Sequence, residues 1–348
     1  MKRCSQCLLP STRPDTAFTE GVCSACISHE SRKHIDWDDK KRQLVELLDK
    51  HDGKCIVPSS GGKDSFTQVI TLLEMGADVT ALTASTCHLT AIGRRNIDTL
   101  AGYVDTVEIT PNRSVRAKLN RLGLEMVGDI SWAEHISIHT VPFRFALQTK
   151  TPLIFFGENP LAHYGSPTSE HQKEQRMTKR WTAEFGGFLG LRPADLVGVE
   201  GISACDMAAY CGPTDQRLNE AGVEAYFLGQ FVPWCSHANV KTAVEHGFEA
   251  VVPGDRNWWC GENEDNFQTC LHDYLMQKKY GYGRACAQMS VDIRSGRYTR
   301  EELRRECDRM ESLYPDHYLG KSIEDILEPI GLTRERFDEI VEEYTRCP

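Results

Sequence analysis

Long hydrophobic runs are missing from this chain of 348 residues. No stretch approaches the roughly 18 to 20 consecutive apolar residues that a membrane-spanning helix needs. The first residues, Met1-Lys2-Arg3-Cys4, do not lead into the apolar segment of a secretory signal peptide. We therefore expect a protein that does not interact with membranes and that works in the cytoplasm.

Positive charge is also scarce, because 40 Lys and Arg face 50 Asp and Glu and give a net charge of −10. Affinity for a phosphate backbone comes mainly from Lys and Arg. This balance argues against a broad nucleic-acid-binding surface, although it leaves room for a local basic patch. We expect no nucleic-acid partner.

Cysteine, in contrast, is abundant, and four of the 14 cysteines have a regular spacing. Cys4 and Cys7 form one Cys-x-x-Cys pair, and Cys23 and Cys26 form a second. Two such pairs are typical of a closed tetrahedral zinc site with a structural or partner-docking role. We predict a zinc-binding unit over residues 1–34 that needs the metal to fold. The isolated cysteines are expected to be ordinary buried thiols: Cys205, Cys211, Cys235, Cys260, Cys270 and Cys286.

A glycine-containing segment, Ser59-Ser60-Gly61-Gly62-Lys63-Asp64-Ser65, lies between an apolar run and a helical pattern. Glycines let the main chain approach a ligand, and a helix N-terminus attracts anions. Ser60 and Ser65 would add hydroxyl donors and Lys63 a mobile positive charge, whereas Asp64 suits a divalent cation that accompanies phosphate. A plain turn with a carboxylate near a helix start is the alternative. We predict a site for a nucleotide with magnesium.

The segment is not a Walker A loop, because Asp64 stands where Ser or Thr is required. It is similar instead to the S-G-G-x-D-S signature of the PP-loop ATP pyrophosphatases. That resemblance implies a loop that holds pyrophosphate while AMP is transferred, with ATP contacts from Ser60, Gly61, Gly62, Lys63, Asp64 and Ser65.

Strand-like apolar runs alternate with helical patterns along the chain, which predicts an α/β fold with a doubly wound parallel sheet. We assign this domain to residues 35–260, with an irregular insertion near 165–222, and a helical C-terminal region to residues 261–348. A charged amphipathic helix over 35–48 should follow the zinc unit. Strands are expected at 55–57, 79–82, 107–109, 153–156, 226–228 and 250–252.

Polar residues that follow the strands are candidate site residues, because ligands of such sheets bind beyond the carboxyl ends of the strands. Gly157-Glu158-Asn159 is predicted to contact a metal, a ribose or an acceptor, although Asn159-Pro160 also fits a turn. In Arg94-Arg95-Asn96 the arginines suit an acidic sugar or a diphosphate, and an exposed helix face is the ordinary alternative. A polar, aromatic stretch from Gly254 to Arg284 suits a sugar or plain helix packing.

Taken together, five features of the chain resemble the N-acetyl sugar amidotransferase family. They are the cysteine pairs, the glycine loop and the segments Ile92–Asn96, Gly157–Asn159 and His272–Arg284. The resemblance implies a cytoplasmic enzyme of surface polysaccharide or flagellar glycan synthesis. It would use ATP, Mg²⁺ and a structural Zn²⁺ to turn an acetamido group of a nucleotide-activated sugar into an acetamidino group.

The resemblance also suggests roles for individual residues. Asp64 would hold magnesium and, with Lys63, assist transfer of AMP to the acetamido oxygen before ammonia displaces it. His272 and Asp273 are candidate acid–base or acceptor-binding groups. Substrate contacts are assigned to Arg94, Arg95, Asn96, Tyr274 and Arg284.

Ammonia must come from elsewhere, because the sequence shows no glutaminase nucleophile: residue 2 is Lys, and no cysteine lies in a G-x-C-x-G elbow. A separate glutaminase subunit is therefore predicted. Two other functions share these motifs: a tRNA-thiolating PP-loop enzyme, and a nucleotide-binding module that recruits a partner without catalysis.

Overall fold

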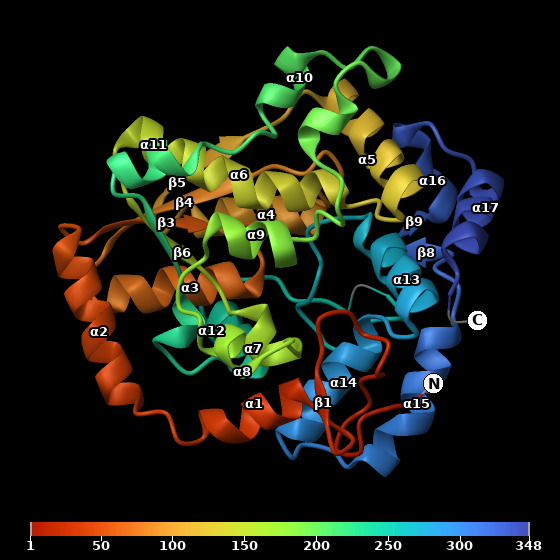
Figure 1. Ribbon diagram of the computed structural model, residues 1–348, viewed down its shortest axis with the longest axis horizontal. Coiled ribbons are helices and arrows are strands. Elements are labelled where there is room, and N and C mark those ends of the chain that lie inside the picture. The colour runs from red at the N-terminus through yellow and green to blue at the C-terminus, as the bar shows by residue number, and fades with distance from the viewer. Residues whose placement is uncertain (1, 253, 347–348) are drawn as a thin grey trace.

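A five-stranded parallel sheet forms the centre of the computed structural model, which describes residues 2–252 and 254–346 (Figure 1). Its strands lie in the order β5-β4-β3-β6-β7. The predicted α/β fold with a parallel sheet is confirmed. The strands are β3 (Lys54–Pro58), β4 (Asp78–Ala84), β5 (Asp105–Ile109), β6 (Leu153–Phe156) and β7 (Glu224–Phe227).

The prediction of a strand at residues 250–252 is wrong. The main chain of Val251 bonds to a nearby turn rather than to a neighbouring strand. Its N–H donates to the Glu264 carboxylate at 2.6 Å, and its carbonyl accepts from the N–H of Gly261 at 2.9 Å. Because these local bonds satisfy the backbone, the apolar run does not join the sheet.

Side chains of the central strands alternate between two apolar layers. In β3, Cys55 and Val57 pack on one face and Ile56 packs on the other. Burial of both faces explains why these strands read as continuous apolar runs. One layer is completed by α2 (Trp37–Lys50), α3 (Lys63–Glu74), α4 (Ala91–Leu100) and α12 (Ser236–Glu245). The other layer is completed by α6 (Trp132–Thr149), α9 (Lys179–Phe185) and α11 (Asp215–Glu220).

The strand order places a crevice between β3 and β6. The chain moves outward in one direction from β3 through β4 to β5, and then returns to β6 on the other side of β3. Connections that leave neighbouring strands in opposite directions open a binding crevice beyond their carboxyl ends. The glycine loop follows β3, and Gly157 follows β6, so both lie at this edge.

The N-terminal unit packs on helices from the other end of the chain (Figure 1). It consists of β1 (Phe18–Thr19), β2 (Val22–Cys23) and α1 (Ser24–Arg32). Its cysteines share a buried cluster with Met289 of α14 (Arg284–Arg294) and Leu303 of α15 (Arg300–Ser312). The unit is therefore part of a larger core.

A second helical core lies beside the sheet and joins α13 (Thr269–Tyr280), α16 (Ile323–Leu327) and α17 (Arg334–Tyr344) to residues at the end of α5 (Arg113–Val127). None of the helices in residues 2–252 and 254–346 has the length and apolar character that a membrane span requires. The remaining elements are α7 (Pro160–Tyr164), α8 (Ser169–Lys173), α10 (Ala204–Ala208), β8 (His317–Tyr318), β9 (Lys321–Ser322) and four short 3₁₀ turns, Pro193–Leu196, Val199–Gly201, Leu228–Gln230 and Glu328–Ile330.

Candidate active site and metal centre

The glycine loop presents the start of α3 without a side-chain cap. Gly62 is the N-cap residue, and it has no side chain that could accept a hydrogen bond from the first helical N–H groups. Gly61 has φ = 78°, and a Cβ there would stand 2.6 Å from Cγ1 of Ile97 in α4. Only glycine fits this left-handed, closely packed position. Uncapped N–H groups and the helix dipole make the loop a candidate anion site.

Lys63 is a buried ion-pair partner, which differs from the mobile cation expected from the sequence. Its ammonium group lies 2.6 Å from Oδ2 of Asp64 and 2.5 Å from Oε1 of Glu262, and its side chain is 3% exposed. Burial lowers the pKa of Lys63, but the two carboxylates outweigh this effect and raise it. The other oxygen of Asp64 accepts from the amide of Asn239 in α12 at 2.7 Å.

Acidic groups outnumber this one lysine. Burial raises the pKa of Glu158 to about 7, and the negative charge of Asp64 adds to that effect. Burial also raises the pKa of Asp265. Asp64 and Glu262 pair directly with the buried ammonium, and the carboxyl groups of Glu158 and Asp265 lie within electrostatic range of it. Such an excess of negative charge and oxygen donors suits a hard divalent cation.

A cavity of about 220 Å³ opens beside the loop at the carboxyl edge of the sheet. Its polar lining includes the hydroxyls of Ser60 and Ser65 and the carboxylate of Asp265, and its apolar lining includes Leu82 and Phe156 from two strands. A flat apolar group with a charged extension would match these walls.

In the segment Gly157-Glu158-Asn159, the glycine and the asparagine have structural roles. A Cβ on Gly157 would lie 3.2 Å from the ring of Trp234, so the glycine permits close packing. Asn159 is 1% exposed and caps α7, while its amide donates to the carbonyls of His171 and Glu174 at 2.9 and 3.1 Å. Both polar atoms of its side chain have protein partners, which matches the turn alternative.

The residues Arg94-Arg95-Asn96 bond to neighbouring protein groups. Arg94 pairs with Glu108 at 2.7 Å, and Arg95 makes two hydrogen bonds to Glu249 at 2.7 and 2.8 Å. The buried Asn96 amide exchanges hydrogen bonds with the main chain of Glu249. The neighbouring Gly93 touches the site region instead, because a Cβ there would lie 2.7 Å from Cα of Asp265. No contact supports substrate binding by the three polar residues.

The candidates from the C-terminal region also have internal partners. Asp273 forms a two-point pair with Arg284, with both N–O distances at 3.0 Å. Tyr274 packs in the helical core. His272 lies 2.8 Å from Asp129, which the sequence did not single out. These contacts do not place the four predicted residues at the glycine loop.

The aromatic stretch before them has a packing role. The indole N–H groups of Trp258 and Trp259 both donate to Oδ2 of Asp292, at 2.8 and 2.9 Å. Gln288 accepts from the main-chain N–H of both tryptophans. These bonds attach the stretch to α14, which favours the helix-packing explanation over a sugar platform.

Three residues of the site were not predicted from the sequence: Asn239, Glu262 and Asp265. Glu262 and Asp265 lie in the polar stretch after Gly254, and that density of polar residues was the available signal. Asn239 lies on an otherwise ordinary amphipathic helix and carries no signal.

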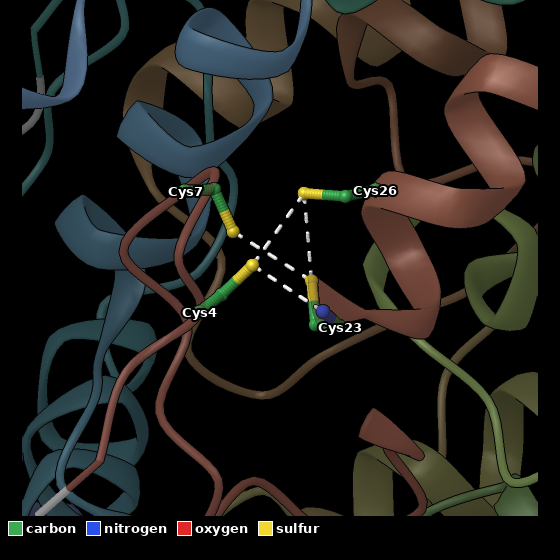
Figure 2. A group of neighbouring side chains, drawn as sticks. All are labelled: Cys4, Cys7, Cys23 and Cys26. Carbon is green, nitrogen blue, oxygen red and sulfur yellow. Dashed lines mark hydrogen bonds between the residues drawn. The ribbon is translucent and has the colours of Figure 1, made fainter. Parts of the chain in front are cut away.

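The four N-terminal cysteines form a buried cluster (Figure 2). Sulfur–sulfur distances are 3.8 Å for Cys4 and Cys26, 3.7 Å for Cys7 and Cys23, and 3.6 Å for Cys23 and Cys26. A tetrahedral zinc ion with Zn–S bonds of about 2.3 Å separates its sulfurs by about 3.8 Å. The cluster could therefore bind a metal ion such as zinc, as the spacing predicted.

The isolated cysteines are not uniformly buried. Cys270 and Cys286 are buried as expected, whereas Cys205, Cys211 and Cys260 are exposed and Cys235 is intermediate. The expectation was wrong for the exposed three, because Cys205 lies on the short surface helix α10 and Cys211 and Cys260 lie in turns, outside the apolar layers.

The fold and the loop together define an α/β protein with a candidate anion site at the carboxyl edge of its sheet. A family model described as LPS biosynthesis protein WbpG-like, C-terminal domain, matches residues 264–347. This match supports the surface-polysaccharide amidotransferase family that the sequence resembles. No curated protein matches the chain.

The cysteine cluster predicts a stoichiometric metal. Wild-type protein should contain zinc bound by its N-terminal cysteines, and Cys23→Ser should lose it because one thiolate is removed from a closed site. Elemental analysis of each purified protein measures this loss as the zinc bound per chain. Cys205→Ser, at an exposed cysteine, is the matched control and should retain the metal. Equal metal content in both variants would contradict the assignment.

Burial of Glu158 predicts a pH-dependent cost in stability. A glutamate has an ordinary pKa of about 4.3, whereas the pKa of Glu158 in the folded chain is about 7. The folded state thus holds the proton more tightly, and the stability this provides at low pH is lost as the pH rises toward 7. Glu158→Gln should therefore raise the melting temperature of ligand-free protein more at about pH 8 than at about pH 5.

Differential scanning fluorimetry across this pH range tests the expectation. Glu46→Gln, at an exposed site on α2, should shift the melting temperature equally little at both pH values. A Glu158→Gln variant whose melting temperature parallels that of wild type at every pH would show that Glu158 ionises as an ordinary glutamate.

Proposed function

We propose that this protein is an ATP-dependent amidotransferase that modifies an acetamido group of a nucleotide-activated sugar for lipopolysaccharide or related surface-polysaccharide biosynthesis. The observation that carries the proposal is the uncapped α3 N-terminus behind Gly61 and Gly62, surrounded by carboxylates at the crevice between β3 and β6. The match of residues 264–347 to a lipopolysaccharide biosynthesis domain supports the sugar as acceptor.

The chemistry requires activation, because an amide oxygen is a poor leaving group. In the first step the acetamido oxygen attacks the α-phosphorus of ATP, an O–P bond forms, and the bond to pyrophosphate breaks. In the second step ammonia adds to the activated carbon, AMP leaves with the oxygen, and loss of a proton gives the acetamidino group. The α3 N-terminus would hold the departing pyrophosphate. The ammonia would come from a separate glutaminase.

Magnesium fits the residues at this site. Asp64 and Glu158 are the carboxylates placed beside the loop, and Glu262 already pairs with Lys63. When bound there, magnesium would neutralise phosphate charge. In the protein itself, the amide of Asn239 orients one oxygen of Asp64. The ion pair between Lys63 and Glu262 holds the glycine loop against the turn that contains Glu262.

Removal of the Asp64 charge should stop the first step. In Asp64→Asn, AMP formation should fall by at least about a hundredfold, because charge stabilisation at the phosphates is lost while the side-chain shape is kept. AMP and pyrophosphate are measured with ATP, ammonium and acetamido sugar nucleotides. Asp98→Asn, at an exposed position of α4, is the control and should keep wild-type rates. Full activity of Asp64→Asn would remove the loop from the mechanism.

A second cavity offers a place for the anionic acceptor. It measures about 310 Å³ and lies where α1, α7, α12 and α14 meet. Arg32 and Arg294 line it together with the rings of Trp37 and Trp234. Trp234 also packs against Gly157, and Tyr164, whose raised pKa reflects burial and the charge of Glu158, lies in its wall.

The charge of Arg32 favours an anion in this cavity. Its guanidinium donates to the carbonyl of Gly229 at 2.8 Å and to Gln230 at 3.4 Å, and no carboxylate pairs with it in the part of the chain that the structure describes. Burial lowers its pKa to about 10. Arg294 is partly balanced by Cys7, 3.7 Å away. A half-buried guanidinium without an acidic partner is well suited to a phosphate or a carboxylate of the sugar nucleotide.

Arg32→Gln should therefore raise the KM for only one of the two substrates. We expect the KM for the sugar nucleotide to rise about tenfold, as loss of a charge-assisted hydrogen bond implies, and the KM for ATP to stay within error of wild type. Steady-state kinetics with each substrate varied in turn measures the difference. Arg42→Gln on the exposed face of α2 is the control. An equal rise in both KM values would exclude this cavity as the acceptor site.

A further inference from the structure

A carboxylate and two imidazoles converge at a point that the proposed reaction does not use. Asp129 lies in the loop between α5 and α6, His135 lies in the first turns of α6, and His272 lies on α13. Nδ1 of His272 is 2.8 Å from Oδ1 of Asp129, and Nδ1 of His135 is 3.1 Å from Oδ2. The three ligand atoms all lie within 4.8 Å of one another.

The accessibility of this cluster is low but not zero. The side chain of Asp129 is 5% exposed, and those of His135 and His272 are 28% and 23% exposed. The main-chain N–H of Ser131 donates to Oδ1 of Asp129 at 2.8 Å, which fixes the carboxylate with Oδ2 toward His135. A small ion can enter such a site, and its position is held by residues from two separate helices.

Hydrogen bonding alone does not account for His135. Among the residues that the structure describes, its buried Nδ1 makes no well-aligned hydrogen bond, although Oδ2 of Asp129 is only 3.1 Å away and the main chain of Gly187 is also within reach. The distance suits a hydrogen bond but the direction does not. A metal ion relaxes this requirement, because nitrogen and oxygen then point to a common centre rather than to each other.

The main chain opposite His135 packs closely against its ring. Gly187 has φ = 79°, and a Cβ there would stand 2.7 Å from Nδ1 of His135. Any other residue would therefore clash with the imidazole. The glycine lets the ring keep the orientation in which Nδ1 faces Asp129.

We propose that Asp129, His135 and His272 bind one divalent transition-metal ion, as a site separate from the cysteine cluster. Two imidazole nitrogens and one carboxylate are a ligand set that suits Zn²⁺, Fe²⁺ or Mn²⁺ and leaves coordination positions open. Neighbouring ligands around such an ion, at metal–ligand distances of about 2.1 Å, are about 3.0 Å apart at right angles. The N–O distances of 2.8 and 3.1 Å agree with this spacing.

The ion would join two parts of the molecule that are distant in sequence. Asp129 and His135 belong to the sheet domain, and His272 belongs to the segment that the family model matches. Glu134, next to His135, lines the cavity beside the glycine loop. Lys279 of α13 donates to the main-chain carbonyls of Val127 and Gly128, just before Asp129 in the chain. The site thus lies at the border between the candidate active site and the C-terminal helices.

Cobalt binding to tag-free, full-length protein with zinc in its cysteine cluster tests the proposal. Equilibrium dialysis should show one Co²⁺ bound per chain in addition to the zinc, with weak ligand-field absorption. A thiolate-to-cobalt charge-transfer band would instead report exchange at the cysteines. Absence of any additional bound cobalt would overturn the proposal.

Variants assign the ion to its ligands. His272→Ala and His135→Ala should each reduce cobalt affinity at least tenfold, as loss of one ligand of three implies, while zinc at the cysteines is unchanged. His317→Ala, at an exposed histidine, is the matched control and should bind as wild type does. Wild-type affinity in both ligand variants would overturn the site.

A measurement on wild-type protein removes any dependence on the folding of the variants. Pulsed electron paramagnetic resonance of one bound Cu²⁺ should show coupling to two imidazoles. Coupling to fewer than two would mean that the cluster is only a hydrogen-bonded pair, with any copper held elsewhere.

Discussion

The buried ammonium group of Lys63 sets the arrangement of the candidate active site. A charge with 3% exposure must be neutralised, and Asp64 and Glu262 supply the two carboxylates. This requirement brings the turn around residue 262 to the start of α3 and therefore to the edge of the sheet. Breaking one partner of such a buried pair is strongly destabilising because the remaining charge is left without compensation.

Two glycines allow this contact between the turn and the start of α3. Gly61 allows α4 to contact the loop through Ile97, and Gly93 allows Asp265 to lie against α4. The loop is therefore held between α4 and the segment that precedes α13. An anion at the α3 N-terminus would meet a preformed site, because the main chain around it is fixed by packing on both sides.

Charge is distributed unevenly over the molecule. Carboxylates surround the glycine loop, whereas the cavity formed by α1, α7, α12 and α14 carries arginines, of which Arg32 has no acidic partner in the described residues. Trp234 and Tyr164 stand between the two regions. In the reaction proposed above, the acidic region would attract the magnesium ion that accompanies the nucleotide, and the basic region would attract the anionic acceptor.

The amino-acid sequence by itself determined the parallel α/β sheet, the glycine loop and the four-cysteine cluster, because each depends on local spacing: apolar runs, adjacent glycines, and two Cys-x-x-Cys pairs. It placed a strand at 250–252 wrongly, because the competing bonds of Val251 come from a turn that no local pattern reveals. Only the tertiary structure decided that Lys63 is a buried ion-pair partner, that Asn239 orients Asp64, and that Asp129 meets two histidines. Those contacts join residues far apart in the chain, and their energies depend on burial and direction, which sequence spacing does not encode.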